Sequence, residues 1–268
     1  MGLNRSRKTV ADLRAIRGVR QMSMIHIEDQ IEAAACAAAG IDVLSIEDPI
    51  WNPQMREAAG DCFVQVGLRY GQLQTTDDYL RAAHNAVIVG GDCCYCAASL
   101  EVITRLSAEG IPVVGHVGLI PSRRTWTGGF KAVGKTLDTA KLVYQQVKAL
   151  ENAGAFAAEM EVVPERIASE IAKRTSVLLF SMGAGSGCDA QYLFSCDVLG
   201  YSEWYTPRHS KVYRDFRSEY ARLQQERVTA FTEFGADVTS GVYPQAEHKV
   251  GVEDQVYDQF MEFLDTVD

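Results

Sequence analysis

Short apolar runs alternate with helical segments along most of this 268-residue chain. Eight of the runs have the length and composition of buried strands, and each is followed by a helix or a loop. The expected strands are Met22–Asp29, Ile41–Ile46, Cys62–Val66, Ala86–Val89, Ile111–Val114, Ala155–Met160, Val177–Ser181 and a short one near Trp204–Thr206. Parallel strands need crossover connections, so this order predicts an α/β fold, most simply one (β/α)8 TIM barrel domain over residues 1–268. An open doubly wound sheet is the alternative, because right-handed crossovers serve both architectures.

The composition argues against several kinds of partner. A formal net charge of -9 disfavours nucleic acid, which needs a basic face. No apolar run approaches the ~20 residues that cross a bilayer, and no apolar segment follows the basic N-terminal residues as a secretory signal would. The seven cysteines are odd in number and lie mostly among apolar or small residues, as free thiols in a reducing compartment do. We therefore expect a cytoplasmic protein that binds neither nucleic acid nor membrane.

Ionisable residues and glycines follow most of the expected strands. In a barrel the carboxyl ends of all strands meet at one mouth, where barrel enzymes bind substrate. The residues expected there are Asp29, Asp48, Gly67, Asp92, His116, Glu161 and the turn Gly183–Gly185. Hard carboxylate oxygens favour Mg²⁺ over zinc, and such a metal can chelate a 2-oxo acid and stabilise its enolate. A further carboxylate can then remove the proton next to the carbonyl.

Simpler explanations exist for some of these residues. A carboxylate just after a strand is often a helix N-cap, which explains Asp29 and Asp92 equally well. His116 lies between two glycines after an apolar run, where a histidine can be purely structural. Glu161 stands among apolar residues in AAEMEVVP, and a charge in such surroundings must be paired or catalytic. This pattern favours a functional role for Glu161.

Several separate motifs, in order along the chain, carry a family resemblance. They are GIPVVGHVGLIP, GGFKAVGKT, LENAGAFAAEMEVVP, MGAGSGCDAQ, PRHSKVY and GVYP, with a thinner match in TVADLRAIRG and AAGIDVLSIED. With these motifs the chain resembles the ketopantoate hydroxymethyltransferases of the pantothenate pathway. The resemblance implies a (β/α)8 barrel of the phosphoenolpyruvate mutase/isocitrate lyase type. It implies assembly into a large homo-oligomer such as a decamer. It also implies Mg²⁺, and transfer of a hydroxymethyl group from 5,10-methylene-tetrahydrofolate to 3-methyl-2-oxobutanoate.

The resemblance also implies roles for particular residues. Glu161 would remove the C3 proton, and His116 would lie beside the substrate. Asp48 would match the first metal-linked aspartate of the family. The turn Gly183–Gly185 and Asp189 would match the glycine turn after the seventh strand, which we expect to contact the substrate.

The front half of the chain departs from the family pattern. The family's Gly-Asp-Ser is Glu47-Asp48-Pro49 here, and Gly67 stands where a second metal-linked aspartate is expected. In our alignment Ile88 and Gly90 replace a lysine and a glutamate. We therefore expect a rebuilt site, with Glu47, Asp48 and Asp92 as metal ligands and Asp29 beside the substrate; Glu28 is a further source of oxygen ligands.

Three functions are compatible with these residues. The first is a Mg²⁺-dependent hydroxymethyltransferase or aldol-type enzyme that acts on a 2-oxo acid. The second is a C–C lyase of the wider superfamily that acts without folate on a 2-hydroxy or 2-oxo acid. The third is a non-catalytic oligomeric homologue that binds a small anion.

Overall fold

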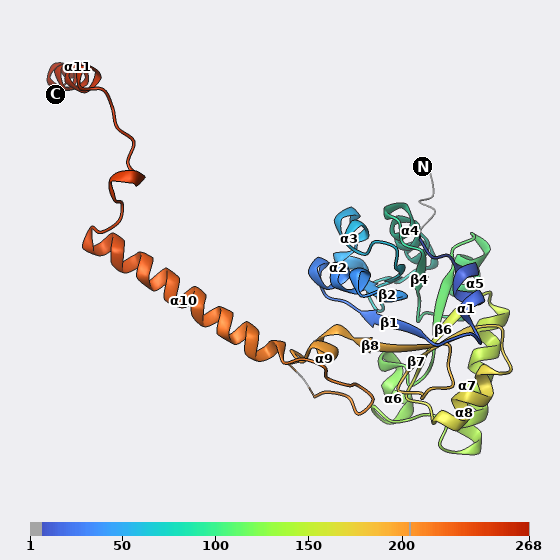
Figure 1. Ribbon diagram of the computed structural model, residues 1–268. Helices are drawn as coiled ribbons and strands as arrows, with labels where there is room; N and C mark the ends of the chain where they lie inside the picture. The colour runs from blue at the N-terminus through green and yellow to red at the C-terminus, as the bar shows by residue number, and fades with distance from the viewer. Residues whose placement is uncertain (1–6, 204, 268) are drawn as a thin grey trace. The chain divides into compact units, whose positions relative to one another are not determined.

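Eight parallel strands form a closed barrel in chain order, and β8 pairs with β1 to complete it (Figure 1). The computed structural model describes residues 7–203 and 205–267. The strands are β1 Met22–His26, β2 Val43–Glu47, β3 Phe63–Gly67, β4 Cys93–Tyr95, β5 Val113–Gly118, β6 Ala157–Glu161, β7 Leu178–Met182 and β8 Ala190–Phe194. The expected (β/α)8 barrel is confirmed.

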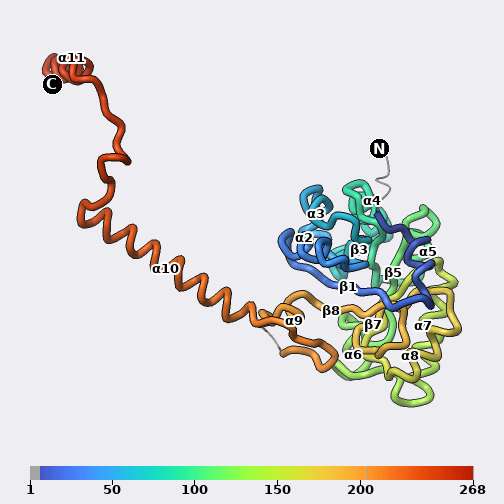
Figure 2. Tube along the Cα trace, viewed as in Figure 1, coloured from blue at the N-terminus to red at the C-terminus, as the bar shows by residue number. Residues whose placement is uncertain are grey.

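Helices precede, follow and separate the strands of this barrel, as the chain trace shows (Figure 2). They are α1 Val10–Ile16, α2 Gln30–Ala38, η1 Asp48–Ile50, α3 Pro53–Ala58, α4 Thr76–Val89, α5 Leu100–Ala108, η2 Pro121–Arg123, α6 Arg124–Thr127, α7 Leu137–Asn152, α8 Glu165–Ala172 and α9 Ser195–Leu199. Local sequence fixes several of their ends. Thr75 and Thr136 each accept a backbone hydrogen bond in a capping box, and Gly90 ends α4 with φ 109°.

The inward face of the barrel changes character along its strands. Alternate residues of a strand point inward, so Met24 and His26 share one face of β1, and Phe63 and Gln65 share one face of β3. Apolar side chains near the strand starts form the inner core, which includes Met22, Met24, Val43, Phe63, Val114, Leu178 and Phe180. Polar side chains occupy the same face nearer the strand ends. The barrel therefore has an apolar floor below a polar mouth.

The expected fourth strand is wrong. Ala86–Val89 is the last turn of α4, and the strand begins after Gly90, at Cys93. Ala86 is buried at helical spacing from Ala83, whereas Ile88 is 76% exposed. A short apolar run fits a strand and a buried helix segment equally well, and the helical spacing decides here. Tyr95, rather than Ile88, is thus the last residue of the fourth strand.

The eighth strand is also misplaced by the sequence pattern. It runs over Ala190–Phe194; Trp204 lies outside the described residues, and Tyr205 and Thr206 belong to no strand. The link from β7 to β8, residues 183–189, contains no helix, although parallel strands are usually joined by a dozen or more residues. This short link is why a strand–helix alternation misses β8.

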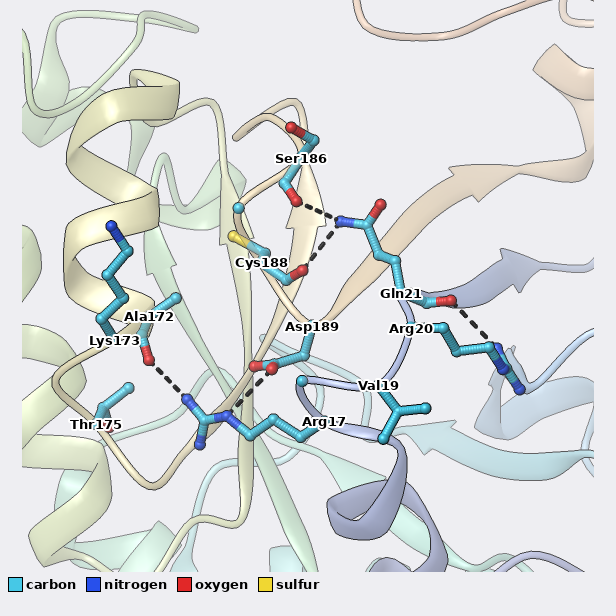
Figure 3. A pocket seen from close by; sticks show the side chains of 12 residues that line it. Arg17, Val19, Arg20, Gln21, Ala172, Lys173, Thr175, Ser186, Cys188 and Asp189 are labelled. Carbon is cyan, nitrogen blue, oxygen red and sulfur yellow. Dashed lines mark hydrogen bonds and ion pairs between the residues drawn. The ribbon is translucent and has the colours of Figure 1, made fainter.

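Residues that precede β1 hold the β7–β8 link in place (Figure 3). Gln21 donates hydrogen bonds from Nε2 to the carbonyls of Ser186 and Cys188, both at 2.9 Å. Arg17 pairs with Asp189, with 3.2 Å between Nε and Oδ1, and also bonds the carbonyl of Ala172 at 2.6 Å. The residues that make these contacts line a cavity at the base of the barrel, opposite the mouth.

The chain divides into two compact units, residues 1–214 and 215–268, and the barrel lies entirely in the first. The second unit contains α10 Phe216–Ser240, the short η3 Ala246–His248 and α11 Asp254–Val267. No side chain of α10 or α11 is buried, and large apolar residues such as Phe231 and Phe260 are more than half exposed. Within the described chain, no helix is long and apolar enough to cross a membrane.

Candidate active site

A cavity of about 340 Å³ opens at the carboxyl ends of the strands. Its lining comes from seven strands, from η2 and from the segment after α9. The lining residues are His26, Ser45, Glu47, Tyr95, His116, Pro121, Glu159, Glu161, Met182, Tyr192, Phe194, Pro207 and His209. The position at the strand ends and the density of ionisable groups make this cavity the candidate active site.

His116, on β5, lies at the centre of a hydrogen-bonded cluster. Its Nε2 is 2.8 Å from the carbonyl oxygen of Leu119, so Nε2 must carry a proton and donate it. Neutral His116 then accepts at Nδ1, where the hydroxyl of Tyr95 lies at 2.8 Å. The tautomer of this buried imidazole is therefore set by the protein. A glutamate carboxyl group also lies near each ring nitrogen: Glu159 near Nδ1 and Glu161 near Nε2.

Glu161 ends β6 and faces the ring of His116. The distance from its Oε2 to His116 Nε2 is 3.2 Å, and the residue is 9% exposed within the cavity. Its backbone carbonyl accepts a 2.9 Å hydrogen bond from the Leu119 amide. The next residue, Val162, has φ 47°, and no other non-glycine residue of the described chain has positive φ. A β-branched residue in this conformation is strained, and such strain often accompanies functional sites.

Glu159 lies two residues before Glu161, on the same face of β6 and deeper in the barrel. Its Oε1 accepts a 2.7 Å hydrogen bond from Gln65 Nε2, and its Oε2 is 3.6 Å from His116 Nδ1. Burial raises the pKa of Glu159 to about 7, against the opposing effect of His116. The Oε1 of Gln65 is buried without a hydrogen-bond partner among the described residues. Glu159 can therefore hold a proton near neutral pH.

On the opposite wall, His26 and Tyr192 enclose the cavity. His26 packs against Phe194 with ring centroids 4.7 Å apart, and burial lowers the pKa of His26 to about 4. Burial also raises the pKa of Tyr192 well above its ordinary value. Both rings are therefore neutral at physiological pH. They give the cavity an uncharged aromatic side facing its acidic side.

Glu47 reaches from the end of β2 over Gly67, its neighbour on β3. A Cβ atom at Gly67 would lie 3.1 Å from both carboxylate oxygens of Glu47, so the glutamate occupies the space that a side chain at 67 would need. Partial desolvation raises the pKa of Glu47, and the carboxylates of Glu28 and Asp48 raise it further. Glu47 thus brings a carboxylate into the cavity where β3 provides none.

Two other expected site residues lie near the mouth but outside the lining of the cavity. Asp48 begins η1 and forms a 3.1 Å ion pair with Arg69. Asp29 is the N-cap of α2, where its Oδ1 accepts a 2.8 Å hydrogen bond from the amide of Glu32. The capping explanation accounts for the observed contacts of Asp29.

Asp92 and Asp189 lie at the opposite end of the barrel from the cavity. Asp92 precedes β4; its Oδ2 accepts from the Val64 amide at 2.8 Å and from Arg56 at 3.0 Å. Asp189 precedes β8 and pairs with Arg17. Asp92 was expected after the fourth strand because that strand was placed too early. Neither carboxylate can share a ligand with Glu161, so we do not propose a metal or substrate role for them.

The glycines after β7 make room for neighbouring side chains. A Cβ at Gly183 would lie 2.8 Å from Nδ1 of His209, and one at Gly185 would lie 2.4 Å from Cγ of Glu165. Both glycines have positive φ, which also favours glycine. Gly183 and Gly185 therefore allow His209 and Glu165 to approach the turn, at the edge of the mouth.

The donor set at the mouth was tested for its fit to the expected Mg²⁺. Within the part of the chain that the structure describes, no group of three or more His, Cys, Asp or Glu side chains is arranged to hold a metal ion. Asp48, one of the expected ligands, is bound by Arg69, and Asp92 is at the wrong end of the barrel. The described residues at the mouth therefore do not form a Mg²⁺ site.

Three residues that line the cavity were not anticipated, Tyr95, Glu159 and Tyr192, and neither was Gln65, which donates a hydrogen bond to Glu159. The period of two along a strand could have identified Glu159, because Glu159 and Glu161 must share a face in AAEME. The same rule places Gln65 on the inward face of β3 with Phe63 and Gly67. Tyr95 could not be found until the fourth strand was placed correctly.

A closed (β/α)8 barrel whose ionisable side chains converge at the carboxyl ends of its strands is the architecture of a barrel enzyme. A family model described as ketopantoate hydroxymethyltransferase matches residues 58–246, and the chain belongs to this family. It is 32% identical to the 3-methyl-2-oxobutanoate hydroxymethyltransferase of Thermus thermophilus, over 90% of this chain and 99% of that protein. The enzyme of the same name from Alkaliphilus metalliredigens is 32% identical over 85% of this chain and 80% of its own length.

Solved structures confirm the type of barrel. A putative phosphonomutase from Burkholderia cenocepacia superposes with a TM-score of 0.55 at 11% identity, over 85% of this chain and all of its own. A 2,3-dimethylmalate lyase, a member of the PEP mutase/isocitrate lyase superfamily, gives a TM-score of 0.51 at 13% identity, over 72% of this chain and 83% of its own. These likenesses concern the fold alone.

Proposed function

We propose that this protein transfers a hydroxymethyl group to a 2-oxo acid such as 3-methyl-2-oxobutanoate, with Glu161 as the base. The observation that carries the proposal is the Glu161–His116 pair at the mouth, with 3.2 Å between Oε2 and Nε2. Membership of the ketopantoate hydroxymethyltransferase family supports the reaction class. The one-carbon donor that we propose is 5,10-methylene-tetrahydrofolate, as a co-substrate.

The proposed reaction begins with proton removal. The Glu161 carboxylate takes the proton from C3 of the 2-oxo acid, and the electron pair of the C–H bond forms the enolate. The proton on His116 Nε2 is directed at the Leu119 carbonyl, with Glu161 Oε2 at 3.2 Å, so we propose that His116 orients the carboxylate while the Tyr95 hydroxyl occupies Nδ1. Water hydrolyses the methylene bridge of the donor to formaldehyde and tetrahydrofolate. The enolate carbon then attacks the carbonyl carbon of formaldehyde, and the new alkoxide takes the proton held by Glu161 to give the hydroxymethyl product.

Glu159 has a second proposed role, as a buried acid that stays partly protonated. Its carboxyl lies beside His116 without reaching the cavity mouth as Glu161 does, and Gln65 holds it in place. A protonated Glu159 adds no negative charge near the enolate, whereas an ionised one would. We therefore propose that Glu159 limits the number of charges in the cavity while Glu161 acts as base.

We route no step of this reaction through a metal. Glu47 is the expected ligand that does reach the cavity, and Glu28 contributes to its raised pKa. Mg²⁺ dependence is tested directly by comparing proton exchange in metal-free buffer with exchange at several Mg²⁺ concentrations. Exchange that is insensitive to chelators would agree with the donor set; a requirement for Mg²⁺ would show that the loops of the mouth rearrange to bind it.

Proton exchange in heavy water tests the role of Glu161. We expect the wild-type protein to exchange the C3 proton of 3-methyl-2-oxobutanoate and Glu161→Gln to be slower by about 10³-fold, within the range for loss of a general base. Glu170→Gln, an exposed glutamate of α8, is the matched control and should keep the wild-type rate. The absence of exchange with every 2-oxo acid tried, in wild type and variant alike, would overturn the proposal.

The folate donor separates the proposed reaction from its alternative. Formation of a hydroxymethyl product should require 5,10-methylene-tetrahydrofolate. Cleavage of a C–C bond in a 2-hydroxy or 2-oxo acid without folate would instead identify a lyase.

We also propose a cytoplasmic homo-oligomer. Support for assembly comes from the large apolar side chains of α10 and α11, none of which is buried within their own unit. Light scattering after size-exclusion chromatography will give the number of subunits. A monomer at micromolar concentration would contradict this proposal.

A further inference from the structure

A second cavity of about 450 Å³ adjoins the candidate active site. His209 lines both cavities, so the two are neighbours on either side of its ring. The walls of the second cavity come from the loop before α7, the start of α8, the turn after β7 and the segment after α9. Its polar side chains are Lys135, Glu165, Gln191, Arg208 and His209.

Lys135 and Arg208 give this second cavity its positive charge. Neither side chain forms an ion pair with any residue in the ranges 7–203 and 205–267. By contrast, Arg17, Arg20 and Arg56 each pair with an aspartate. Lys135 and Arg208 thus lie beside one cavity without such a partner among the described residues. They are available to an anionic ligand.

The one acidic side chain of this lining does not neutralise them. Glu165 accepts hydrogen bonds from the amide of Ser186 at 3.1 Å and from its hydroxyl at 2.8 Å. These bonds turn the carboxylate toward the β7–β8 link and lower the pKa of Glu165. Lys135 and Arg208 together still outweigh its single charge.

The first cavity lacks the cation that an acidic substrate needs. Its lining contains three glutamates and no lysine or arginine. A carboxylate placed between Glu47 and Glu161 would be repelled, because like charges in a partly desolvated site destabilise one another. The second cavity shares His209 with the first and supplies two cations that have no ion-pair partner among the described residues.

We propose that the second cavity is a carboxylate-binding subsite in which Lys135 and Arg208 bind an anionic group of a ligand whose reacting part lies beside Glu161. This inference rests on the proposed function. Two reactants can supply the group: the carboxylate of the 2-oxo acid, or the glutamate tail of the folate donor. The shared chemistry is a carboxylate bound by charge-assisted hydrogen bonds. His209, held against Gly183, separates this subsite from the reacting groups.

Binding measurements on the full-length protein test the subsite. The variants are Lys135→Gln, Arg208→Gln and the double variant; Lys141→Gln, an exposed lysine of α7, is the matched control. The first pair of probes is 3-methyl-2-oxobutanoate and 3-methyl-2-butanone, which lacks the carboxylate. The second pair is tetrahydrofolate and the amide of tetrahydropteroate, which lacks the glutamate tail and carries no carboxylate. Titration calorimetry gives Kd for each protein and probe.

We expect each single variant to weaken binding of the carboxylate-bearing probe by about tenfold, and the double variant by about 100-fold, as for lost charge-assisted hydrogen bonds. Binding of the probe without the carboxylate should not change. A loss confined to the oxo acid assigns the subsite to the substrate, and a loss confined to tetrahydrofolate assigns it to the donor.

The proposal is overturned if the variants bind every probe as Lys141→Gln does, or if probes with and without the carboxylate weaken equally. These results differ from failure of the proposed function, which is absence of C3 proton exchange in the wild-type protein. Circular dichroism of the double variant confirms that any loss of binding occurs in folded protein.

Discussion

The two ends of the barrel treat their carboxylates differently. At the base, Asp42, Asp92 and Asp189 each have an arginine partner, supplied by Arg20, Arg56 and Arg17. At the mouth, Glu47, Glu159 and Glu161 line one cavity, and no lysine or arginine lines it with them.

These ion pairs with arginine explain why only the carboxylates at the mouth are suited to acid–base catalysis. A carboxylate fixed by an arginine is satisfied, and its removal mainly leaves an uncompensated charge in the fold. Carboxylates that crowd one another around a histidine have proton affinities that depend on their neighbours, which is what acid–base catalysis uses. Position at a strand end is thus not sufficient evidence of function; the partner of each acid decides.

The largest expected effect on stability comes from the base. Asp92→Asn should lower the free energy of unfolding by about 3 kcal/mol, because it leaves Arg56 partly buried without its charge partner. The rate of C3 proton exchange per folded molecule should stay near that of wild type. Urea unfolding and the exchange assay measure the two quantities, with Asp138→Asn on the surface of α7 as control. A large loss of exchange in folded protein would show that the two ends are not independent.

Glu159→Gln should change stability in a pH-dependent way. Because the folded-state pKa of about 7 exceeds that of an ordinary glutamate, the stability that protonated Glu159 contributes is full below the unfolded pKa and is lost as pH rises through 7. Glutamine does not titrate. The free energy of unfolding of the variant, relative to that of wild type, should therefore rise by at most ~1.4 kcal/mol per pH unit between the two pKa values. His26 has the opposite slope, but it is common to both proteins and cancels in the difference.

Unfolding of Glu159→Gln and wild type at pH 5 and pH 8 gives this difference. A difference in unfolding free energy between the two proteins that is the same at pH 5 and pH 8 would show that Glu159 is ionised throughout. The amide introduced by the variant can also donate to Gln65 Oε1, which otherwise has no partner among the described residues. This contact adds a pH-independent gain that the comparison separates.

Val162→Gly should separate strain from activity. Glycine adopts positive φ without the strain of roughly 1–3 kcal/mol that valine has there. It also removes the packing of the valine side chain and raises the conformational entropy of the unfolded chain. We therefore expect little net change in stability, and about a tenfold lower exchange rate because Glu161 is held less firmly. Val162→Ala, which keeps the Cβ atom, should lie between the two. An unchanged rate in the glycine variant would show that the strained backbone does not position Glu161.

Gly67→Ala should have the smallest effect. The new Cβ would lie 3.1 Å from both oxygens of Glu47, and the end of a flexible side chain can move by the few tenths of an ångström required. Stability should change by less than about 1 kcal/mol, while KM for the oxo acid should change about threefold as the carboxylate is displaced. Asp61→Ala, before β3, serves as control for the assay. An effect as large as that of Glu161→Gln would make Glu47 a catalytic group.

The sequence predicted the barrel because periodic alternation is set by local burial, and six of the eight expected strands overlap the observed strands. It failed at Ala86–Val89, where helix and strand patterns coincide, and at β8, where the crossover helix is missing. The error in the fourth strand carried Asp92 to the wrong end of the barrel and hid Tyr95.

The candidate site was only partly predictable for a related reason. Glu161 and His116 stand out because each interrupts an apolar strand, and both line the cavity. Tyr192 and His209 carry no such signal, since their place depends on which strands and loops meet across the barrel. The pairing of Asp48 with Arg69 likewise depends on loop geometry that no local pattern encodes.

The polar upper half of the barrel interior has a consequence for how acidity could be adjusted in this scaffold. Glu159 and Glu161 are the same chemical group on the same strand, one step of roughly 6.6 Å apart in depth. Both line the cavity, but the deeper one is 4% exposed and the upper one 9%. Each inward position on a strand therefore corresponds to a different degree of contact with water. Moving a carboxyl group up or down by two residues would retune its proton affinity without a new charged neighbour.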